Sequence, residues 1–430
     1  MHPGPPHSEG AVIQYIRIMR TTSIPEATPR FITLYAIGYV GAYVALITPV
    51  VTTHAIKIED IDPVGKEASL GAIAALGALV AIFANLLTGA LSDRTRSRLG
   101  RRRPWIIGGA LGGVVALAIV GFAPNLVVVA IGWVLAQLTL NMVLAALQAL
   151  LPDQVPLAQR ARVSAVLGIA QQVSPLVGIG IALGVQPAGT PAMFVVTGIV
   201  GAVLMILLAV FVRDVPHAEV TGAFSIGQFV RGFGIARGKR YDFAWAWFGR
   251  FFVILGFAVY TTYQPYFITD RLGVAPEERI LQQLIALIVF SVALTASAIA
   301  CGRLSDRTGR RKPFVFGSAV VVAFGLGMLA LTDSLPGFYL SAVVMGIGIG
   351  AYFAVDLALI TDVLPDKDHA AAKDMGIFNI ANSLPQSVAP ATAPLFLAVG
   401  GGGNYTLLFL LGAVLSLVGA ALIAPIRAVR

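Results

Sequence analysis

The stretch Asn85–Trp105 reads Asn-Leu-Leu-Thr-Gly-Ala-Leu-Ser-Asp-Arg-Thr-Arg-Ser-Arg-Leu-Gly-Arg-Arg-Arg-Pro-Trp and joins two long apolar segments. Between those segments it places one acidic residue, Asp93, and six arginines. A shorter copy, Gly302-Arg-Leu-Ser-Asp-Arg-Thr-Gly-Arg-Arg-Lys-Pro, follows roughly half a chain length later. The repetition predicts two related halves, each with a short basic hairpin between hydrophobic spans.

The composition predicts an all-α membrane protein. Hydrophobic residues make up 57% of the 430-residue chain, charged residues only 12%, and the mean hydropathy is +0.85. Apolar runs of about 20 residues are long enough to cross a bilayer, where only helices satisfy the backbone of a single span. The net charge of +9 comes from short loops between these runs, so we expect the lipid bilayer and no nucleic acid as a partner.

The hydropathy pattern predicts twelve transmembrane helices in two pseudo-symmetric six-helix bundles. We expect a tail at residues 1–30, a first bundle at 31–212, a linker at 213–242 and a second bundle at 243–430. The expected spans are Phe31–His54, Ser69–Leu91, Pro104–Phe122, Asn125–Leu150, Val163–Val185, Ala192–Val212, Phe243–Ile268, Leu281–Arg303, Pro313–Leu331, Phe338–Leu364, Met375–Val399 and Tyr405–Ile426.

The distribution of lysine and arginine predicts the orientation. Of the 30 such residues, Lys57, Lys66, Arg271 and Arg279 fall in loops on one side, and Arg250 lies within a span. All the others fall on the side that holds both termini, which predicts that both termini are cytoplasmic. We expect a plasma-membrane protein.

Other repeats between the halves favour a transporter. Leu151-Pro152-Asp153 after the fourth span matches Leu364-Pro365-Asp366 after the tenth. Repeated halves suit alternating access, in which one bundle rocks against the other around a central site. The spans hold no nucleophile elbow, phosphate loop or cluster of metal ligands, so we expect neither an enzyme nor a bound metal or cofactor. The glycines of Gly346–Gly350 lie inside an apolar span, and helix packing is their expected role.

Twelve spans, a central linker and the repeated Gly-x-x-Ser-Asp-Arg pattern resemble the major facilitator superfamily. The longer first copy, from Ser92 to Trp105, resembles its glycoside–pentoside–hexuronide branch and is most similar to the sucrose:proton symporters. This resemblance implies a monomer that carries a small-molecule substrate together with a proton. It also implies a cytoplasmic gate in which Asp93 meets the start of the eleventh span near Asp374, and basic residues of each hairpin pair with Asp153 or Asp366. The expected gate residues are Asp93, Arg94, Gly100, Arg101, Arg102, Asp153, Asp306, Arg310, Arg311 and Asp366.

Asp356 is the clearest ionisable residue within a span. It lies in the tenth span, about two turns from the cytoplasmic end. Burial disfavours the charged form of a carboxyl that has no cationic partner, which suits a proton carrier. The alternative is a structural ion pair with Arg250 of the seventh span.

Uncharged polar residues also gather within the spans. Amides hydrogen-bond hydroxyl groups and aromatic rings stack on apolar faces, so this set could line a path for a sugar. Hydrogen bonds between helices are the alternative for each of them. The set is Tyr39, Tyr43, Gln137, Asn141, Gln148, Gln171, Gln172, Tyr260, Tyr263, Gln264, Tyr352, Asn379, Asn382 and Gln386.

Several positions depart from the relatives. Ala81 and Asn85 stand where sodium-coupled members of the branch carry two carboxylates, which disfavours sodium coupling. Gln137 and Gln148 stand where sucrose symporters carry an Asp and an Arg, which weakens the sucrose assignment. The alternative is a proton-driven exporter of drugs or lipid-like compounds, although the Ser174-Pro175 segment matches the helix-kinking motif of such exporters only in part.

Overall fold

The computed structural model describes residues 26–212, 240–363, 378 and 380–426, and within these residues the chain is helical with no strand. The first half contains α2 (Pro29–Thr48), the π-helix η1 (Pro49–Thr53), α3 (His54–Ile61), α4 (Lys66–Ser92), α5 (Arg103–Gly121), α6 (Leu126–Gln154), α7 (Leu157–Val185), the short 3-10 helix η2 (Gln186–Ala188) and α8 (Thr190–Phe211). The second half contains α10 (Arg240–Asp270), α11 (Arg279–Thr308), α12 (Lys312–Leu331), α13 (Leu335–Val363), α15 (Pro385–Leu397) and α16 (Tyr405–Ile423).

Eleven helical segments of the described chain are long and apolar enough to cross a membrane. They correspond to eleven of the twelve expected spans. The remaining expected span, Met375–Val399, includes α15 but begins outside the described residues. Asp366, Asp374 and Asn379 also lie outside the described residues.

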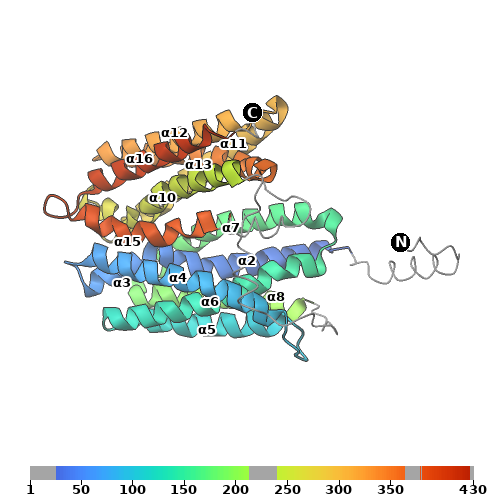
Figure 1. Ribbon diagram of the computed structural model, residues 1–430. Helices are drawn as coiled ribbons and strands as arrows, with labels where there is room; N and C mark the ends of the chain where they lie inside the picture. The colour runs from blue at the N-terminus through green and yellow to red at the C-terminus, as the bar shows by residue number, and fades with distance from the viewer. Residues whose placement is uncertain (1–25, 213–239, 364–377, 379, 427–430) are drawn as a thin grey trace.

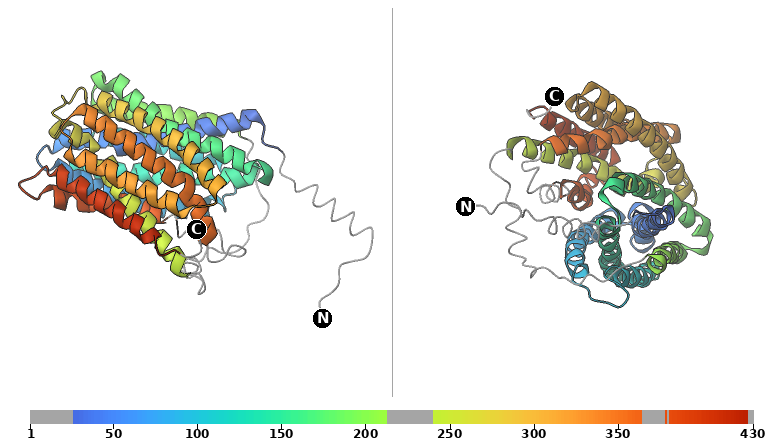
Figure 2. Two further views of the ribbon diagram at one scale, coloured as in Figure 1. Left: turned by 90° about the horizontal axis from the view of Figure 1, so that it is seen from above. Right: turned by 90° about the vertical axis from the view of Figure 1, so that its right-hand side faces the viewer.

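The helices form two halves with matching internal contacts (Figures 1 and 2). In the first half α2 packs against α7 and α8, α4 against α6, and α5 against α6 and α8. In the second half α10 packs against α15 and α16, α11 against α13, and α12 against α13 and α16. Each contact in one list has its counterpart in the other, so the two halves are pseudo-symmetric, as the repeated motifs predicted.

The contacts between the halves follow the same symmetry. In the first half α4 meets α15, and the equivalent pair is α11 with α7. At the α4–α15 contact Gly71 faces the other half so closely that a Cβ there would lie 2.3 Å from the Pro390 carbonyl oxygen. That carbonyl lies four residues before Pro394, which has no N–H to donate to it. Tyr263 of α10 donates to the Pro390 carbonyl instead, at 3.1 Å.

Glycines set the distance between helices in the second half. On α13, a Cβ at Gly346 would lie 2.5 Å from the Phe290 carbonyl oxygen, and one at Gly350 would lie 2.2 Å from the Leu294 carbonyl oxygen. Both carbonyls belong to α11, so the absence of a side chain lets the two backbones touch. This confirms the packing role predicted for the glycine run.

The first helix is longer than predicted. Instead of ending at His54, it continues through η1 and α3 to Ile61, a total of 33 residues. Pro49 cannot supply a helical N–H, and the chain passes it as a π-helix rather than stopping. The extension buries His54, whose ring lies 4.2 Å from that of Trp133, measured between centroids.

The ends of other helices also shift. α6 continues to Gln154, so Leu151-Pro152-Asp153 forms its last turn rather than a loop after it. α11 continues to Thr308 and therefore contains Asp306 of the second basic hairpin.

Candidate functional site

Arg102 is the centre of the first basic hairpin. Its side chain is only 3% exposed, and it donates to Ser92 Oγ at 2.7 Å, Asp93 Oδ1 at 2.5 Å and Asp153 Oδ2 at 2.9 Å. Arg101 donates to the same Asp153 oxygen at 2.7 Å. These contacts tie the ends of α4, α5 and α6 together and place both arginines on Asp153, the pairing implied by the family resemblance.

Two further residues shape this hairpin. Gly100 has a φ of 102°, a conformation that a residue with a side chain rarely adopts, and it turns the chain back toward α5. Trp105 donates its indole N–H to Thr95 Oγ1 at 2.7 Å and so closes the loop.

The expected gate also involves the other half of the molecule. Asp93 contacts Arg102, and the contacts described above lie within the first half. The expected partner near Asp374 lies outside the described residues, and so does Asp366. A role in gating therefore stays a prediction.

The second hairpin carries the other copy of the motif. Asp306, Arg307 and Arg310 are exposed, Arg311 is half-buried, and no ion pair among the described residues involves Asp306. Gly309, with a φ of 64°, ends α11 between Arg307 and Arg310. Asp366, the predicted partner of this hairpin, lies outside the described residues, so its pairing with Arg310 or Arg311 stays a prediction.

Replacing Asp93 by Ala is expected to slow transport about fivefold while leaving the substrate Kd unchanged. The Asp93 side chain is 60% exposed, and a pair this exposed contributes at most about 1 kcal/mol. Initial uptake rates and equilibrium binding in the same preparation measure the two effects. Asp306→Ala is the matched control, because the same substitution in the second copy removes no described ion pair. A loss of affinity at an unchanged rate would contradict the gating role.

A second group of polar residues lies inside the second half. Arg250 of α10 forms an ion pair with Asp356 of α13, whose residue exposure is 2%. The Arg250 guanidinium also lies 4.7 Å from the centroid of the Phe378 ring and donates weakly to Asn382 Oδ1 at 3.5 Å. Tyr352, one helical turn before Asp356, is fully buried beside the pair.

In this arrangement the Asp356 carboxyl can change its charge, whereas the Arg250 guanidinium cannot. Arginine stays protonated in proteins, whereas a carboxyl can exist as a paired anion or as a neutral acid. The aromatic ring on Arg250 offers the cation a second favourable contact when its carboxylate partner is neutral. The pair can therefore serve as a structural bridge between α10 and α13 or as a site that binds and releases a proton.

The predicted substrate-lining amides that the structure describes differ in their exposure. Gln137, Asn141 and Gln264 are buried, and Asn141 donates to the Gln137 side chain at 2.8 Å. Asn382 is half-buried, and four glutamines within the helices are exposed: Gln148, Gln171, Gln172 and Gln386. An amide that faced hydrocarbon would lose its hydrogen bonds with water, so these side chains indicate a surface that is wet rather than lipid-covered.

The predicted substrate-lining tyrosines differ in what they contact. The centroid of the Tyr39 ring lies 5.4 Å from that of Tyr35, edge to face, and 5.9 Å from that of Tyr43, so the three rings form a row along α2. Tyr260 is buried with its ring 5.9 Å from that of Phe257. Tyr263 is fully buried, and its hydroxyl meets backbone carbonyls of α4 and α15, so the structure places it as a contact between helices.

Comparison with known families agrees with this architecture. The Major Facilitator Superfamily description matches residues 30–276 and again 246–429, which together cover nearly the whole chain. The chain belongs to the major facilitator superfamily. The first match covers the first half and continues through α10, and the second covers most of the second half of this major facilitator protein.

Curated relatives match only part of this major facilitator protein. An uncharacterized MFS-type transporter, YfiU of Bacillus subtilis, is 31% identical over 144 residues, which are 33% of this chain and 27% of that protein. The multidrug resistance protein MdtL of a Shewanella species is 29% identical over 113 residues, 26% of this chain and 28% of that protein. The chain thus matches less than a third of the length of each relative.

Solved structures share the fold over its full length. The nucleoside transporter NupG superimposes with a TM-score of 0.69 at 13% identity, covering 93% of this chain and 99% of that one. A bacterial homolog of the human lysosomal transporter Spinster, in an inward-facing and occupied conformation, gives 0.68 at 15% identity and covers 92% and 94%. At these identities the likeness concerns the fold alone.

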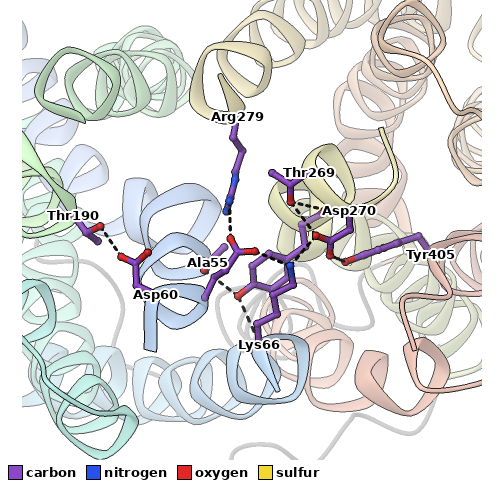
Figure 3. Close-up of polar contacts among 10 residues, drawn as sticks. Ala55, Asp60, Lys66, Thr190, Thr269, Asp270, Arg279 and Tyr405 are labelled. Carbon is purple, nitrogen blue, oxygen red and sulfur yellow. Dashed lines mark hydrogen bonds and ion pairs between the residues drawn. The ribbon is translucent and has the colours of Figure 1, made fainter. Parts of the chain in front are cut away.

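The structure of this major facilitator protein also reveals polar contacts between the halves that the sequence did not predict. Gln283 of α11 accepts from Thr52 at 2.9 Å and donates to the Val51 carbonyl of η1 at 2.6 Å. Tyr266 of α10 donates to the Ala55 carbonyl at 3.0 Å. These contacts lie at the end opposite the basic hairpins, and Figure 3 shows the charged residues of the same end around Ala55. The signal that the sequence offered for this region was Lys66 and Arg279, two of the four basic residues assigned to the side opposite the termini.

Proposed function

We propose that this protein is a secondary active transporter that moves a small solute, a sugar such as a disaccharide, by proton-coupled symport with alternating access. The observation that carries the proposal is the buried Arg250–Asp356 pair, which joins two helices within the second half. A carboxyl in this position can couple two events, because its charge state and the strength of its bond to Arg250 change together. The partners are then a proton and one small-molecule substrate, carried by a monomer.

The exposed glutamines support a polyhydroxylated solute. Gln148 and Gln171 belong to α6 and α7 of the first half, and Gln386 belongs to α15 of the second. Each amide offers both a donor and an acceptor, which suits the hydroxyl groups of a sugar and places no charge on the path. The resemblance of the Ser92–Trp105 hairpin to the glycoside–pentoside–hexuronide branch favours the same substrate class.

The distribution of charge supports the orientation. The basic hairpins lie at one end of the bundle, which we infer to be the cytoplasmic end of a plasma-membrane protein with both termini inside the cell. The polar contacts through Gln283 and Tyr266 then lie at the outer end. We infer that the structure represents a state whose outer side is closed.

Export is the second candidate, and one observation favours it. The match to the multidrug resistance protein MdtL suggests a proton-driven exporter of drugs or lipid-like compounds. Such a protein would exchange the proton for its substrate rather than carry both in one direction. The direction of proton movement therefore discriminates the two candidates.

The deciding experiment measures pH inside proteoliposomes after addition of sucrose, maltose, glucose or a cationic dye. Sugar-induced proton uptake is the expected result for symport, and it should disappear in the Asp356→Asn variant. No response to any sugar, combined with dye-linked proton movement in the opposite direction, would replace symport by export.

A further inference from the structure

Four charged residues at the outer end form one continuous network between the halves (Figure 3). Lys66 of α4 contacts Glu59 of α3 at 2.6 Å and Asp270 of α10 at 2.7 Å. Arg279 of α11 contacts the other oxygen of Glu59 at 2.6 Å. The network therefore contains two ion pairs between halves, Lys66–Asp270 and Arg279–Glu59, and one ion pair within the first half, Lys66–Glu59.

These side chains are largely withdrawn from solvent. The exposed fraction is 3% for Arg279, 11% for Lys66, 23% for Glu59 and 29% for Asp270. A partly buried ion pair depends strongly on its partner, because a lone charge left in such a place has lost its water without compensation. Separation of the halves must therefore give each of the four charges another partner or expose it to water.

The charges are balanced within each half. The first half contributes Lys66 and Glu59, and the second contributes Arg279 and Asp270. Lys66 and Glu59 already touch, so this pair survives separation. Asp270 ends α10 and Arg279 begins α11, at the two ends of one short loop of the second half. Each half thus carries its own cation and its own anion to the outer surface.

We propose that this network is a partner-exchange lock. In the closed state the cation of each half binds the anion of the other, and in the outward-open state each cation binds the anion of its own half. Exchange keeps every charge paired, so the halves separate without stranding a buried ion. The lock holds the outer side closed until the cross-half pairs are replaced, whichever solute the protein carries.

Two hydrogen bonds from residues of the second half hold the Asp270 carboxylate in place. The Tyr405 hydroxyl donates to Asp270 Oδ2 at 2.7 Å, and Thr269 donates to Oδ1 at 3.1 Å. Both donors belong to the second half and remain when Lys66 departs. The Asp60–Thr190 hydrogen bond, 2.7 Å long, lies within the first half and does not join the halves, although it is close by (Figure 3).

The test measures the distance between two spin labels at the outer end by double electron–electron resonance. It uses the purified full-length protein without substrate. Labels are placed at Val64→Cys and Ala275→Cys, two exposed loop positions in different halves, after Cys301→Ser removes the native thiol. Arg279→Gln should raise the ratio of open to closed molecules about tenfold, since it removes a cross-half pair. Arg271→Gln is the matched control, because Arg271 pairs with Asp333 of its own half at 2.6 Å.

A charge exchange distinguishes the lock from a general loss of packing. The double variant Glu59→Arg, Arg279→Glu retains opposite charges across the halves but leaves two cations in one half and two anions in the other. It should therefore be no more open than the parent protein, whereas Arg279→Gln opens. If the double variant opens as far as Arg279→Gln, or if Arg279→Gln and Arg271→Gln give the same distances, the lock is wrong. Asp270→Asn removes the other cross-half pair and replaces Arg279→Gln should that variant not fold.

Discussion

Replacing Asp356 by Asn is expected to abolish uphill accumulation of the solute while exchange of preloaded solute continues. Asparagine keeps the shape and an oxygen acceptor toward Arg250, but it cannot alternate between a charged and a neutral form. Without that alternation a proton gradient cannot be converted into a solute gradient. The solute-loaded protein can still pass between its outward-open and inward-open states, so exchange continues. Accumulation against a gradient and counterflow in proteoliposomes measure these properties separately.

The same variant also tests the structural alternative. If the pair only holds α10 against α13, removal of one partner strands a buried Arg250 and costs about 3–5 kcal/mol, which should appear as a loss of folded protein. The double variant Arg250→Gln, Asp356→Asn removes both charges and should then recover stability. Recovery of both folding and accumulation in the double variant would contradict a coupling role for Asp356.

Replacing Gly350 by Ala is expected to destabilise the protein by about 3 kcal/mol or to prevent folding. The added Cβ would lie 2.2 Å from the Leu294 carbonyl oxygen and 2.9 Å from its Cα. These atoms belong to the backbone of α11, so relief requires the two helices to move apart rather than one side chain to rotate. The thermal unfolding midpoint of purified protein in detergent measures the effect.

The matched control is Gly327→Ala on α12. A Cβ at Gly327 would have open space, with nothing within 4 Å. Alanine also favours helix more than glycine, so this variant should unfold at the same temperature as the parent or slightly higher. Equal midpoints for the two variants would show that the α11–α13 contact does not limit stability.

Features encoded locally were predictable from the sequence. Apolar runs of bilayer length predicted the spans, and the two copies of the basic motif predicted the pseudo-symmetric halves. Arg250 was the one basic residue inside a span, so Asp356 had one candidate cation among the helices. Glycine spacing within an apolar run predicted close helix contact, and the approach of Gly350 to Leu294 has that cause.

Features that depend on distant contacts were not predictable in the same way. Lys57 was expected in a loop because the first span was predicted to end at His54, and nothing local shows that the helix continues through η1 and α3 to Ile61. The residue type of Tyr263 suits both a substrate and a carbonyl of another helix, and only the packing of α10 decides between them. The four-charge network requires both halves to be placed before its members meet.

The contact of α4 with α15 has a mechanical consequence. Gly71 brings the backbone of α4 against the proline-containing α15 there, and the Tyr263 hydroxyl of α10 reaches carbonyls of both helices at this point. Surfaces with interdigitated side chains must disengage before they can turn, whereas smooth surfaces can roll while staying in touch. Because the contact is made by backbone and small residues, it can act as a pivot for the change of tilt between the halves that the proposed alternating access requires.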